Sequence, residues 1–250
     1  MAVIGIMSAM HEELAAVLAV MPDEQRVGVA GRDFWVGHWH GHEVVAVLSR
    51  IGKVAAATTA TVLLERFKVD ALVFTGAAGG LAPHAQVGDV VVATGFVQHD
   101  MDASPLFPKH EVPLYGRARF DTDSALSEAL AAAAAQVLSD PAQHLGAQAI
   151  ADFHLLSPRV HQGLVVSGDR FVSITAESQA LQRSLPDALA VEMEGAAVAQ
   201  VCLDYGVPFA AVRTISDRAD DDAHTDFSRF IRDVASRYSL AVLSRWLMDR

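Results

Sequence analysis

Short apolar runs alternate along the chain with segments in which apolar residues recur at helical spacing. The first run, residues 3–7, leads directly into a helical pattern at 10–18, and Ser8 is a candidate N-cap. Apolar runs also flank His40 and Gly41, where the glycine supplies the positive φ of a tight turn, so we expect a hairpin. The first half is predicted to contain strands at 3–7, 34–39, 43–48, 69–75 and 87–93 and helices at 10–18 and 53–66.

The second half of the chain continues this alternation. An alanine-rich run at 124–138 predicts a helix, because alanine has the highest intrinsic helix propensity. Gly206 is expected to cap the helix that precedes it. The other expected elements are strands at 162–167, 188–191 and 208–215 and helices at 177–184, 194–205 and 227–247. Residues 140–158 show no regular pattern.

Strands that alternate with helices predict an α/β fold, and the early hairpin makes its sheet mixed rather than purely parallel. The chain has no internal repeat and no linker rich in proline, glycine or serine. We therefore expect residues 1–250 to form a single domain in which helices flank a mixed β-sheet.

Composition narrows the class of protein. Hydrophobic residues make up 52% of the chain, yet no apolar stretch reaches the roughly 18 residues that a membrane span needs. The start lacks a basic leader, so we expect a cytoplasmic protein. The net charge of −11 argues against a nucleic-acid groove and favours a small-molecule partner. The single cysteine, Cys202, excludes an internal disulfide and lies in a pattern typical of a buried thiol.

Acidic residues follow three of the predicted strands, and a glycine-rich segment follows a fourth. In open α/β sheets, ligands bind outside the carboxyl ends of the strands, so these residues are expected at one edge. The residues are Glu12 and Glu13, Glu192 and Glu194, Ser216 and Asp217, and the glycine-rich segment Gly76–Gly80.

Taken singly, each of these features has an ordinary structural explanation. Acids in the first turn of a helix interact favourably with its dipole, Asp217 is suited to an Asx-turn, and the glycines are suited to a tight turn with positive φ. Together, acids at one crevice raise one another's pKa, which is typical of general acid–base catalysis. Cleavage of a glycosidic bond needs an acid, a base and hydrogen bonds to the sugar hydroxyls, and three carboxylates match these tasks.

Six motifs carry a resemblance to a known family, and they fall in order across nearly the whole chain. They are GIMSAMHEE at 5–13, IGKVA at 51–55, TGAAGGL at 75–81, VSGD at 166–169, VEME at 191–194 and RTISD at 213–217. With them the sequence resembles the 5′-methylthioadenosine/S-adenosylhomocysteine nucleosidases. The resemblance implies a nucleoside-phosphorylase-like α/β fold, a homodimer, no metal and no organic cofactor.

The resemblance also implies roles for individual residues. Asp217 would protonate N7 of adenine, Glu13 would be the base for the attacking water, and Arg213 would lie near that water. Glu194 would accept hydrogen bonds from the ribose hydroxyls, and Met193 would pack under the sugar.

Further residues would complete the substrate site. Phe171 would stack on adenine, and Val172 would offer its backbone to the base edge. The ribose and alkylthio side would be lined by Met10, Ile51 and Phe227, and the other candidates for substrate binding are Ala78, Glu192 and Ser216. In the homodimer, the partner's loop from Leu106 to Pro113 would add an apolar residue.

The sequence departs from the family pattern at a few positions. Ala77 stands where many members have serine, which removes a contact to the water or the sugar. Arg50 and Arg170 stand where small residues are common, and the segment 140–162 is longer than usual. The alternating histidines of the hairpin have no cysteine or fourth ligand near them, so we do not expect a metal site there.

We therefore predict an N-glycosyl hydrolase that releases adenine and the thioribose from methylthioadenosine and S-adenosylhomocysteine, a step of methionine salvage. One alternative is a hydrolase of 6-amino-6-deoxyfutalosine. Another is a purine nucleoside phosphorylase, for which Arg50 is a candidate phosphate ligand, although Glu12 and Glu13 occupy the helical turn where an anion would bind. A nucleoside-binding protein without activity is disfavoured because all three acids are present.

Overall fold

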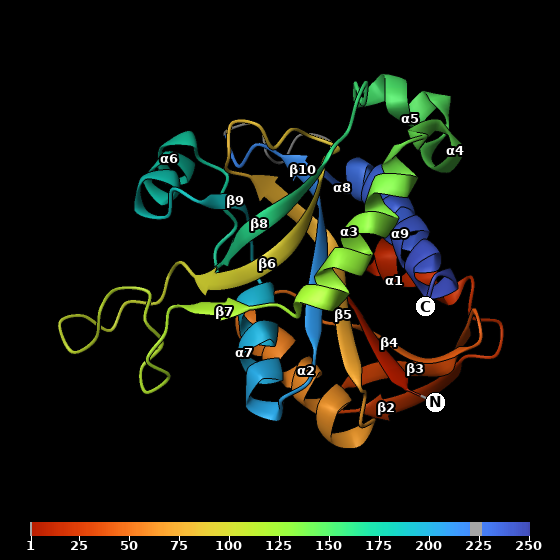
Figure 1. Cartoon of the computed structure of the whole chain (residues 1–250), viewed down its shortest axis with the longest axis horizontal. Helices are drawn as coiled ribbons and strands as arrows, with labels where there is room; N and C mark the ends of the chain where they lie inside the picture. Colours follow the sequence, from red (N-terminus) through yellow and green to blue (C-terminus); the bar gives the residue numbers. More distant parts are fainter. Residues whose placement is uncertain (1, 221–226) are drawn as a thin grey trace.

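The computed structural model describes residues 2–220 and 227–250, in which helices cover both faces of a mixed sheet (Figure 1). The strands are β1 Val3–Ser8, β2 Gln25–Val29, β3 Arg32–Trp39, β4 His42–Leu48, β5 Ala71–Gly80, β6 Val90–Gln98, β7 Arg119–Asp121, β8 Val160–Ser167, β9 Ala188–Glu192 and β10 Phe209–Asp217. The helices are α1 His11–Leu18, α2 Lys53–Arg66, α3 Ser124–Leu138, α4 Pro141–Leu145, α5 Ala147–Asp152, α6 Thr175–Ser184, α7 Gly195–Tyr205, α8 Phe227–Phe230 and α9 Ser236–Met248, with a π-helical segment at Ile231–Ala235.

Part of the sheet closes on itself. Strand β10 pairs in parallel with β5 and antiparallel with β6, and β6 pairs in parallel with β8. Strand β9 pairs in parallel with β8 and antiparallel with β5, which completes a ring of five strands. Strands β1, β4, β3 and β2 continue the sheet outward from β5. The predicted α/β fold with a mixed sheet is confirmed, although the sheet is partly closed rather than open.

Two large hydrophobic layers hold most of the helices against the sheet, and a smaller third cluster contacts α6. Successive side chains of a strand point to opposite faces, so Val73 packs toward α1, α3 and α9, whereas Leu72 and Phe74 pack toward α2 and α7. Cys202 of α7 lies in the second layer, and burial raises the pKa of its thiol to about 12. The prediction of a buried thiol is confirmed.

The expected turn and cap are found. His40 and Gly41 both have positive φ, at 48° and 81°, as a two-residue hairpin turn between β3 and β4 requires. Gly206 ends α7 in the left-handed conformation with φ of 65°. None of the described helices is both long and apolar enough to cross a membrane.

Two local predictions are wrong. Ser8 is the last residue of β1, and α1 begins after Met10 instead. The segment Gly76–Gly80 does not turn toward a helix but continues β5, and none of its glycines has a positive φ. Their small size serves close packing, because a Cβ on Gly80 would lie 2.8 Å from the carbonyl oxygen of Ala85.

Several elements have no clear sequence signal. Strand β2 lies at the outer end of the sheet with mostly exposed residues, and β7 has three residues. The irregular segment contains the short helices α4 and α5 before it enters β8. The single closing helix expected at 227–247 is interrupted by the π-helical turn at Ile231–Ala235.

The contact of Gly195 with Phe96 provides a test of this packing. A Cβ on Gly195 would lie 2.2 Å from Cε1 of Phe96, whose ring is fully buried on β6. We expect Gly195→Ala to lower the free energy of unfolding by about 1–3 kcal/mol, the usual cost of overpacking, as measured by denaturant unfolding. Gly28→Ala is the control, because the nearest atom to its Cβ would be 4.0 Å away. Equal unfolding free energies in the two variants would contradict this packing.

Candidate active site

A cavity of about 150 Å³ lies where β5, β9 and β10 end and where the segments after β1 and β4 meet them. The carboxyl ends of β5 and β9 meet because these antiparallel strands overlap only there, with Gly79 paired to Val191 and Gly80 to Ala190. The cavity is lined by Ala9, Met10, Ile51, Ala77, Ala78, Gly79, Phe171, Glu192, Met193, Glu194, Ser216, Asp217 and Phe227.

A β-bulge positions Asp217. Ile215 pairs with Ala78 and Asp217 pairs with Gly79, so Ser216 is an extra residue on β10. Such bulges re-aim side chains and are common beside active sites. Oδ1 of Asp217 accepts a hydrogen bond from the backbone N of Ala219 at 2.8 Å, and Oδ2 accepts one from the Ser216 hydroxyl at 2.7 Å. Asp217 therefore forms the Asx-type bond considered from the sequence and lines the cavity as well.

Glu192 is held by several donors. Its carboxylate accepts hydrogen bonds from the backbone N of Gly195 at 2.9 Å, from the backbone N of Glu194 at 3.2 Å and from the Ser167 hydroxyl. Arg213 adds an ion pair at 2.9 Å. Glu192 lines the cavity, but its two oxygens are already bound within the protein at the N-terminus of α7.

Arg213 lies behind the cavity wall and is 1% exposed. Besides the pair with Glu192, its guanidinium donates hydrogen bonds to the carbonyl oxygens of Phe74 at 2.9 Å and Val212 at 3.1 Å. It also lies over the Phe74 ring, 4.2 Å from the centroid. The guanidinium is thus oriented by strands β5 and β10 and by the end of β9.

Glu194 faces the cavity and is 5% exposed. Its Oε1 accepts a hydrogen bond at 2.8 Å from the backbone N of Gly52, directly before α2. Burial raises the pKa of Glu194 to about 7, and the charge of Glu192 adds to the effect. This carboxyl group can therefore gain or lose a proton near neutral pH.

Glu13 is fully buried behind Ala9 and Met10, which line the cavity. Its carboxylate accepts hydrogen bonds from the backbone N of Met10 at 3.2 Å and from the Ser239 hydroxyl of α9 at 3.4 Å. Burial raises the pKa of Glu13 to about 7, although the positive charge of Arg213 opposes this rise. A carboxyl group with such a pKa is suited to a general base at neutral pH.

Two aromatic rings lie at the mouth of the cavity. Phe171 and Phe227 meet edge to face, with centroids 6.0 Å apart and an interplanar angle of 75°. Phe171 is 43% exposed and Ile51 is 62% exposed, which is unusual for core residues and typical of a binding surface. Val172 is buried and does not line the cavity.

The structure brings together most of the residues selected from the sequence. Ten of the predicted site residues line the cavity, whereas Glu13, Arg213 and Val172 are buried and do not line it. Glu12 is partly exposed and is not in the wall. The sequence analysis did not select Ala9, although it falls within a quoted motif, and it included Gly79 only as part of the segment Gly76–Gly80.

The departures from the family pattern occupy different places. Ala77 lines the cavity with a methyl group and offers no hydroxyl there. Arg170 forms an ion pair with Glu177 of α6. Arg50 does not line this cavity and donates a hydrogen bond to the carbonyl oxygen of Gly31.

The three histidines of the hairpin bond to separate partners. His38 pairs with Asp23 at 2.6 Å, His40 contacts the Ser244 hydroxyl at 2.7 Å, and Nε2 of His42 lies 3.1 Å from the carbonyl oxygen of Leu247. Within residues 2–220 and 227–250, no group of three or more acidic, histidine or cysteine side chains is placed to hold a metal ion.

The fold and the acidic cavity define an α/β protein of the phosphorylase superfamily, whose family model matches residues 3–245. A 5′-methylthioadenosine/S-adenosylhomocysteine nucleosidase of Marinomonas sp. (strain MWYL1) is 36% identical over 243 residues, which cover 97% of each chain. The chain belongs to this nucleosidase family.

Solved structures show the same likeness. The nucleosidase of Neisseria meningitidis in complex with methylthio-immucillin-A has a TM-score of 0.86 and 31% identity, with 100% of both chains covered. The futalosine hydrolase of Helicobacter pylori has a TM-score of 0.83 and 31% identity, with 100% of this chain and 98% of that chain covered. The predictions of the family, the fold and an N-glycosyl hydrolase are confirmed.

The raised pKa of Glu13 predicts a pH-dependent stability. Between its ordinary pKa of 4.5 and about 7, the folded protein keeps a proton that the unfolded chain has released, so the stability falls as the pH rises through this window. Glutamine does not titrate and avoids this loss. The measured quantity is the unfolding free energy of Glu13→Gln minus that of the natural protein. We expect this difference to increase by up to about 3 kcal/mol from about pH 5 to about pH 8.

The measurement is denaturant unfolding of both proteins across this pH range. Glu12→Gln is the matched control in the same helical turn, because Glu12 is partly exposed, and it should show a smaller pH-dependent difference. A pH-independent difference for Glu13→Gln would show that Glu13 does not carry the raised pKa.

Proposed function

We propose that this protein hydrolyses the N-glycosidic bond of 5′-methylthioadenosine and S-adenosylhomocysteine and releases adenine and the thioribose. The observation that carries this proposal is the placement of Asp217 and Glu194 in one cavity, with the buried Glu13 hydrogen-bonded to the backbone N of Met10, which lines that cavity. Three carboxyl groups at one site can serve as acid, sugar ligand and base. The names of similar proteins support it, because two are 5′-methylthioadenosine/S-adenosylhomocysteine nucleosidases and a third is a futalosine hydrolase.

Asp217 is the proposed general acid. The leaving adenine must gain a proton at N7 as the bond between C1′ and N9 breaks, and a protonated Asp217 would donate it. The Ser216 hydroxyl and the backbone N of Ala219 hold the carboxyl group in one orientation, which reduces the cost of alignment during the reaction.

Glu13 is the proposed general base. As the oxygen of water bonds to C1′, the water loses a proton, and Glu13 would accept it. Arg213 would act near this water, where its positive charge also favours the ionised form of Glu13. Ala77 offers no hydroxyl to the water, so the position of the water would depend on Glu13 and Arg213.

The remaining residues are proposed to hold the nucleoside. Glu194 would accept hydrogen bonds from the ribose hydroxyls above Met193. Phe171 would stack on adenine, and the backbone of Val172 would meet the base edge. The other residues of the substrate set, Met10, Ile51, Ala78, Glu192, Ser216 and Phe227, all line the same cavity.

Water is favoured over phosphate as the nucleophile. Arg213 already pairs with Glu192, and Arg50 lies outside the cavity, so neither is placed to receive an additional anion there. Hydrolysis of 6-amino-6-deoxyfutalosine is the second candidate, because the futalosine hydrolase of Helicobacter pylori is 31% identical to this chain, the same identity as the nucleosidase of Neisseria meningitidis. A binding protein without activity is disfavoured by the intact set of acids.

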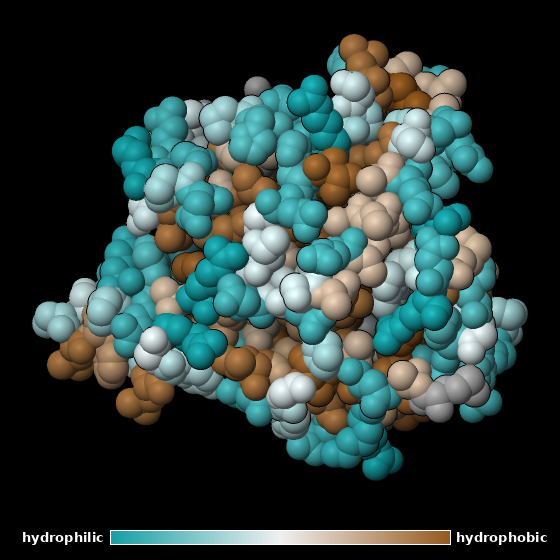
Figure 2. All heavy atoms as spheres, in the orientation of Figure 1, coloured by the Kyte–Doolittle hydropathy of each residue, from teal (hydrophilic) through white to brown (hydrophobic). Residues whose placement is uncertain are grey.

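We further propose a homodimer in which the loop Leu106–Pro113 reaches the neighbouring site. This loop lies in the projecting segment between β6 and β7, where Figure 2 shows apolar side chains at the surface. Leu106 is 84% exposed and Leu114 is 93% exposed, and apolar residues of this size are typical of an interface. A single domain at 1–250, a cytoplasmic location and a role in methionine salvage remain predictions.

Incubation with methylthioadenosine, S-adenosylhomocysteine and 6-amino-6-deoxyfutalosine, each with and without phosphate, tests the reaction. Free adenine with an unphosphorylated sugar supports hydrolysis, and a sugar 1-phosphate contradicts it. The relative rates of the three substrates decide between the nucleosidase and the futalosine alternative.

Replacement of Asp217 tests the proposed acid. Asp217→Asn keeps the shape of the side chain but cannot donate the proton, so we expect turnover to fall at least about 100-fold, the lower range for general acid catalysis. Adenine release from methylthioadenosine is the measurement. Asp249→Asn is the control, since Asp249 is exposed and pairs with Arg245 in the last helical turn. Near-natural turnover in Asp217→Asn would remove Asp217 from this role.

The loop proposal is tested with Leu106→Asp. A charge on this exposed leucine would weaken an apolar interface, so we expect the dimer to dissociate and the KM for methylthioadenosine to rise. Sedimentation equilibrium and steady-state kinetics measure the two effects, with Leu156→Asp as a control at a leucine that is also exposed, at 90%. A stable dimer with an unchanged KM would exclude the loop from the interface and the site.

A further inference from the structure

A second cavity lies beside the active-site cavity, between α1 and the hairpin of β3 and β4. Its volume is about 560 Å³, and apolar side chains form one wall while basic side chains lie at its edge. The apolar wall is formed by Leu14, Leu18, Trp35 and Leu48, and the two arginines are Arg32 and Arg50.

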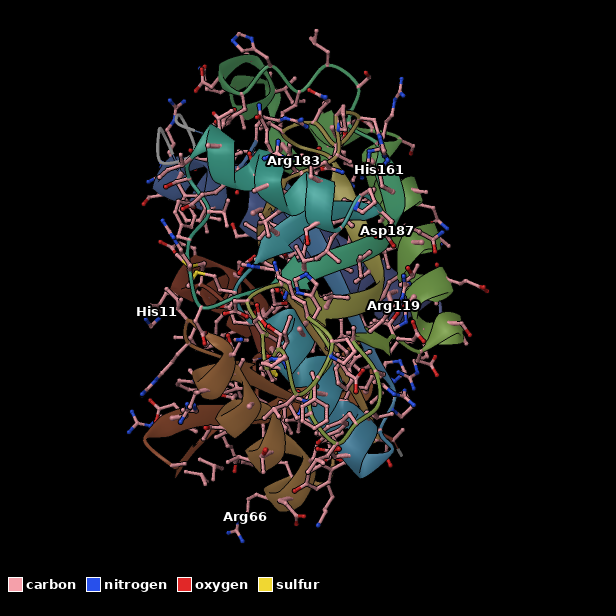
Figure 3. All side chains as sticks on the ribbon, turned by 90° about the vertical axis from the view of Figure 1, so that its left-hand side faces the viewer. His11, Arg66, Arg119, His161, Arg183 and Asp187 are labelled. Atoms are coloured by element: carbon pink, nitrogen blue, oxygen red, sulfur yellow. The ribbon has the colours of Figure 1, made fainter. Side chains whose placement is uncertain are left out.

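Consecutive residues of two segments line the two cavities. Met10 and Ile51 line the active-site cavity, whereas His11 and Arg50 line the second one. The Cα atoms of consecutive residues are about 3.8 Å apart, so the two cavities lie close together on either side of these two segments. His11, which lines the second cavity, is exposed and lies at the edge of the molecule (Figure 3).

Neither arginine of the second cavity has a carboxylate partner among the described residues. Arg32 donates hydrogen bonds to the carbonyl oxygens of Ala30 at 2.9 Å and Ala55 at 3.1 Å, and Arg50 donates one to Gly31. The Nε of Arg32 is buried and has no hydrogen-bond partner in the part of the chain that the structure describes.

The positive charge of this cavity is therefore not neutralised locally. Asp33 also lines the cavity, but its carboxylate is 3.3 Å from Nε of Arg26. Burial lowers the pKa of Arg32, and the charge of Arg50 lowers it further. Two neighbouring guanidinium groups repel each other, and an anion between them would relieve this repulsion.

The backbone of Arg50 is also unusual. Its φ is 63°, in the left-handed region that residues with a Cβ disfavour. A glycine would adopt this conformation readily, yet the chain has an arginine here. Such strain is typical of positions at which the side chain has a function.

We propose that Arg32 and Arg50 bind a carboxylate at the end of the substrate's 5′ substituent. The preferred substrates are then adenine nucleosides whose 5′ chain is apolar near the ribose and anionic at its end. This inference rests on the proposed function, because the 5′ side of the nucleoside must face Met10 and Ile51. The apolar wall covers the chain, and the guanidinium groups donate charge-assisted hydrogen bonds to the carboxylate.

A matched pair of substrates tests the proposal. One is 5′-deoxyadenosine with a 3-carboxypropylthio group at C5′, and the other carries the corresponding primary amide, which has the same length but no charge. We expect the natural protein to prefer the carboxylate by about tenfold in kcat/KM, as for one charge-assisted hydrogen bond. Methylthioadenosine is included in the same assay as the substrate without a tail.

Arg50→Gln should lower this carboxylate-to-amide ratio, and the double variant with Arg32→Gln should reduce it to within about twofold, because the charge-assisted bonds are lost. The ratio within one variant cancels any general loss of activity or folding. Arg66→Gln is the control for net charge, since Arg66 ends α2 and projects from the far end of the molecule (Figure 3). It should keep the natural ratio.

A free inorganic anion shares the chemistry of a carboxylate, so phosphate forms a second arm. We expect phosphate to weaken the carboxylate preference without forming a sugar 1-phosphate. A ratio near one in the natural protein, or an unchanged ratio in Arg50→Gln, overturns the proposal. A third outcome is that phosphate stabilises the natural protein but not Arg50→Gln, while the carboxylate-to-amide ratio of the natural protein is near one. The cavity then binds free anions only, and the proposal is also overturned.

A binding measurement distinguishes failure of this inference from failure of the proposed function. The same two compounds are titrated calorimetrically into Asp217→Asn, in which turnover is suppressed, and into its double variant with Arg50→Gln. Tighter binding of the carboxylate that is lost with Arg50 supports the tail site even if no adenine is released from any compound. Equal binding of the acid and the amide rejects the tail site whether or not methylthioadenosine is cleaved.

Discussion

The buried ion pair between Arg213 and Glu192 is the constraint on which the site depends. Arg213 lies on β10, bonds to a carbonyl oxygen of β5 and pairs with Glu192 at the end of β9. It therefore joins three strands of the ring where they surround the cavity. Removal of one partner would leave a buried charge uncompensated, which costs about 3–5 kcal/mol in typical proteins. Because of this cost, the two residues stabilise the strands around the cavity in addition to any part they take in the chemistry.

The same pair sets the electrostatics of the other acids. Glu192 holds the backbone N atoms at the start of α7 and so fixes Glu194 beside it. Burial raises the pKa of Glu194 and of Glu13 to about 7, and Arg213 limits the rise in both. Without the arginine, these carboxyl groups would remain protonated at higher pH. The balance of burial and one positive charge keeps them able to exchange protons near neutrality.

The two cavities divide the recognition of substrate between them. The active-site cavity combines acids with half-exposed rings, which suits a nucleoside. The neighbouring cavity combines an apolar wall with two arginines, which suits a longer anionic substituent. Arg50 links them, because it directly precedes Ile51 at their common boundary. Arg50, which departs from the family pattern, thus lies where its charge can act on a bound substrate.

The sequence by itself determined the local elements and most residues of the cavity. Apolar periodicity located the long strands and helices, and Gly41 and Gly206 marked a turn and a cap, because these features depend on neighbouring residues. Strand β2 is mostly exposed and β7 is short, so neither produces a clear apolar pattern.

Only the tertiary structure decided how the strands close and which acids face the cavity. The pairing of β5 with β9, the bulge at Ser216 and the place of Glu13 behind Met10 depend on contacts between distant segments. The glycines after Thr75 show the same limit. Their sequence is typical of a turn, but in the structure they allow neighbouring segments of the chain to approach closely. Local residue preferences cannot specify such contacts, because the partner surfaces exist only after the chain has folded.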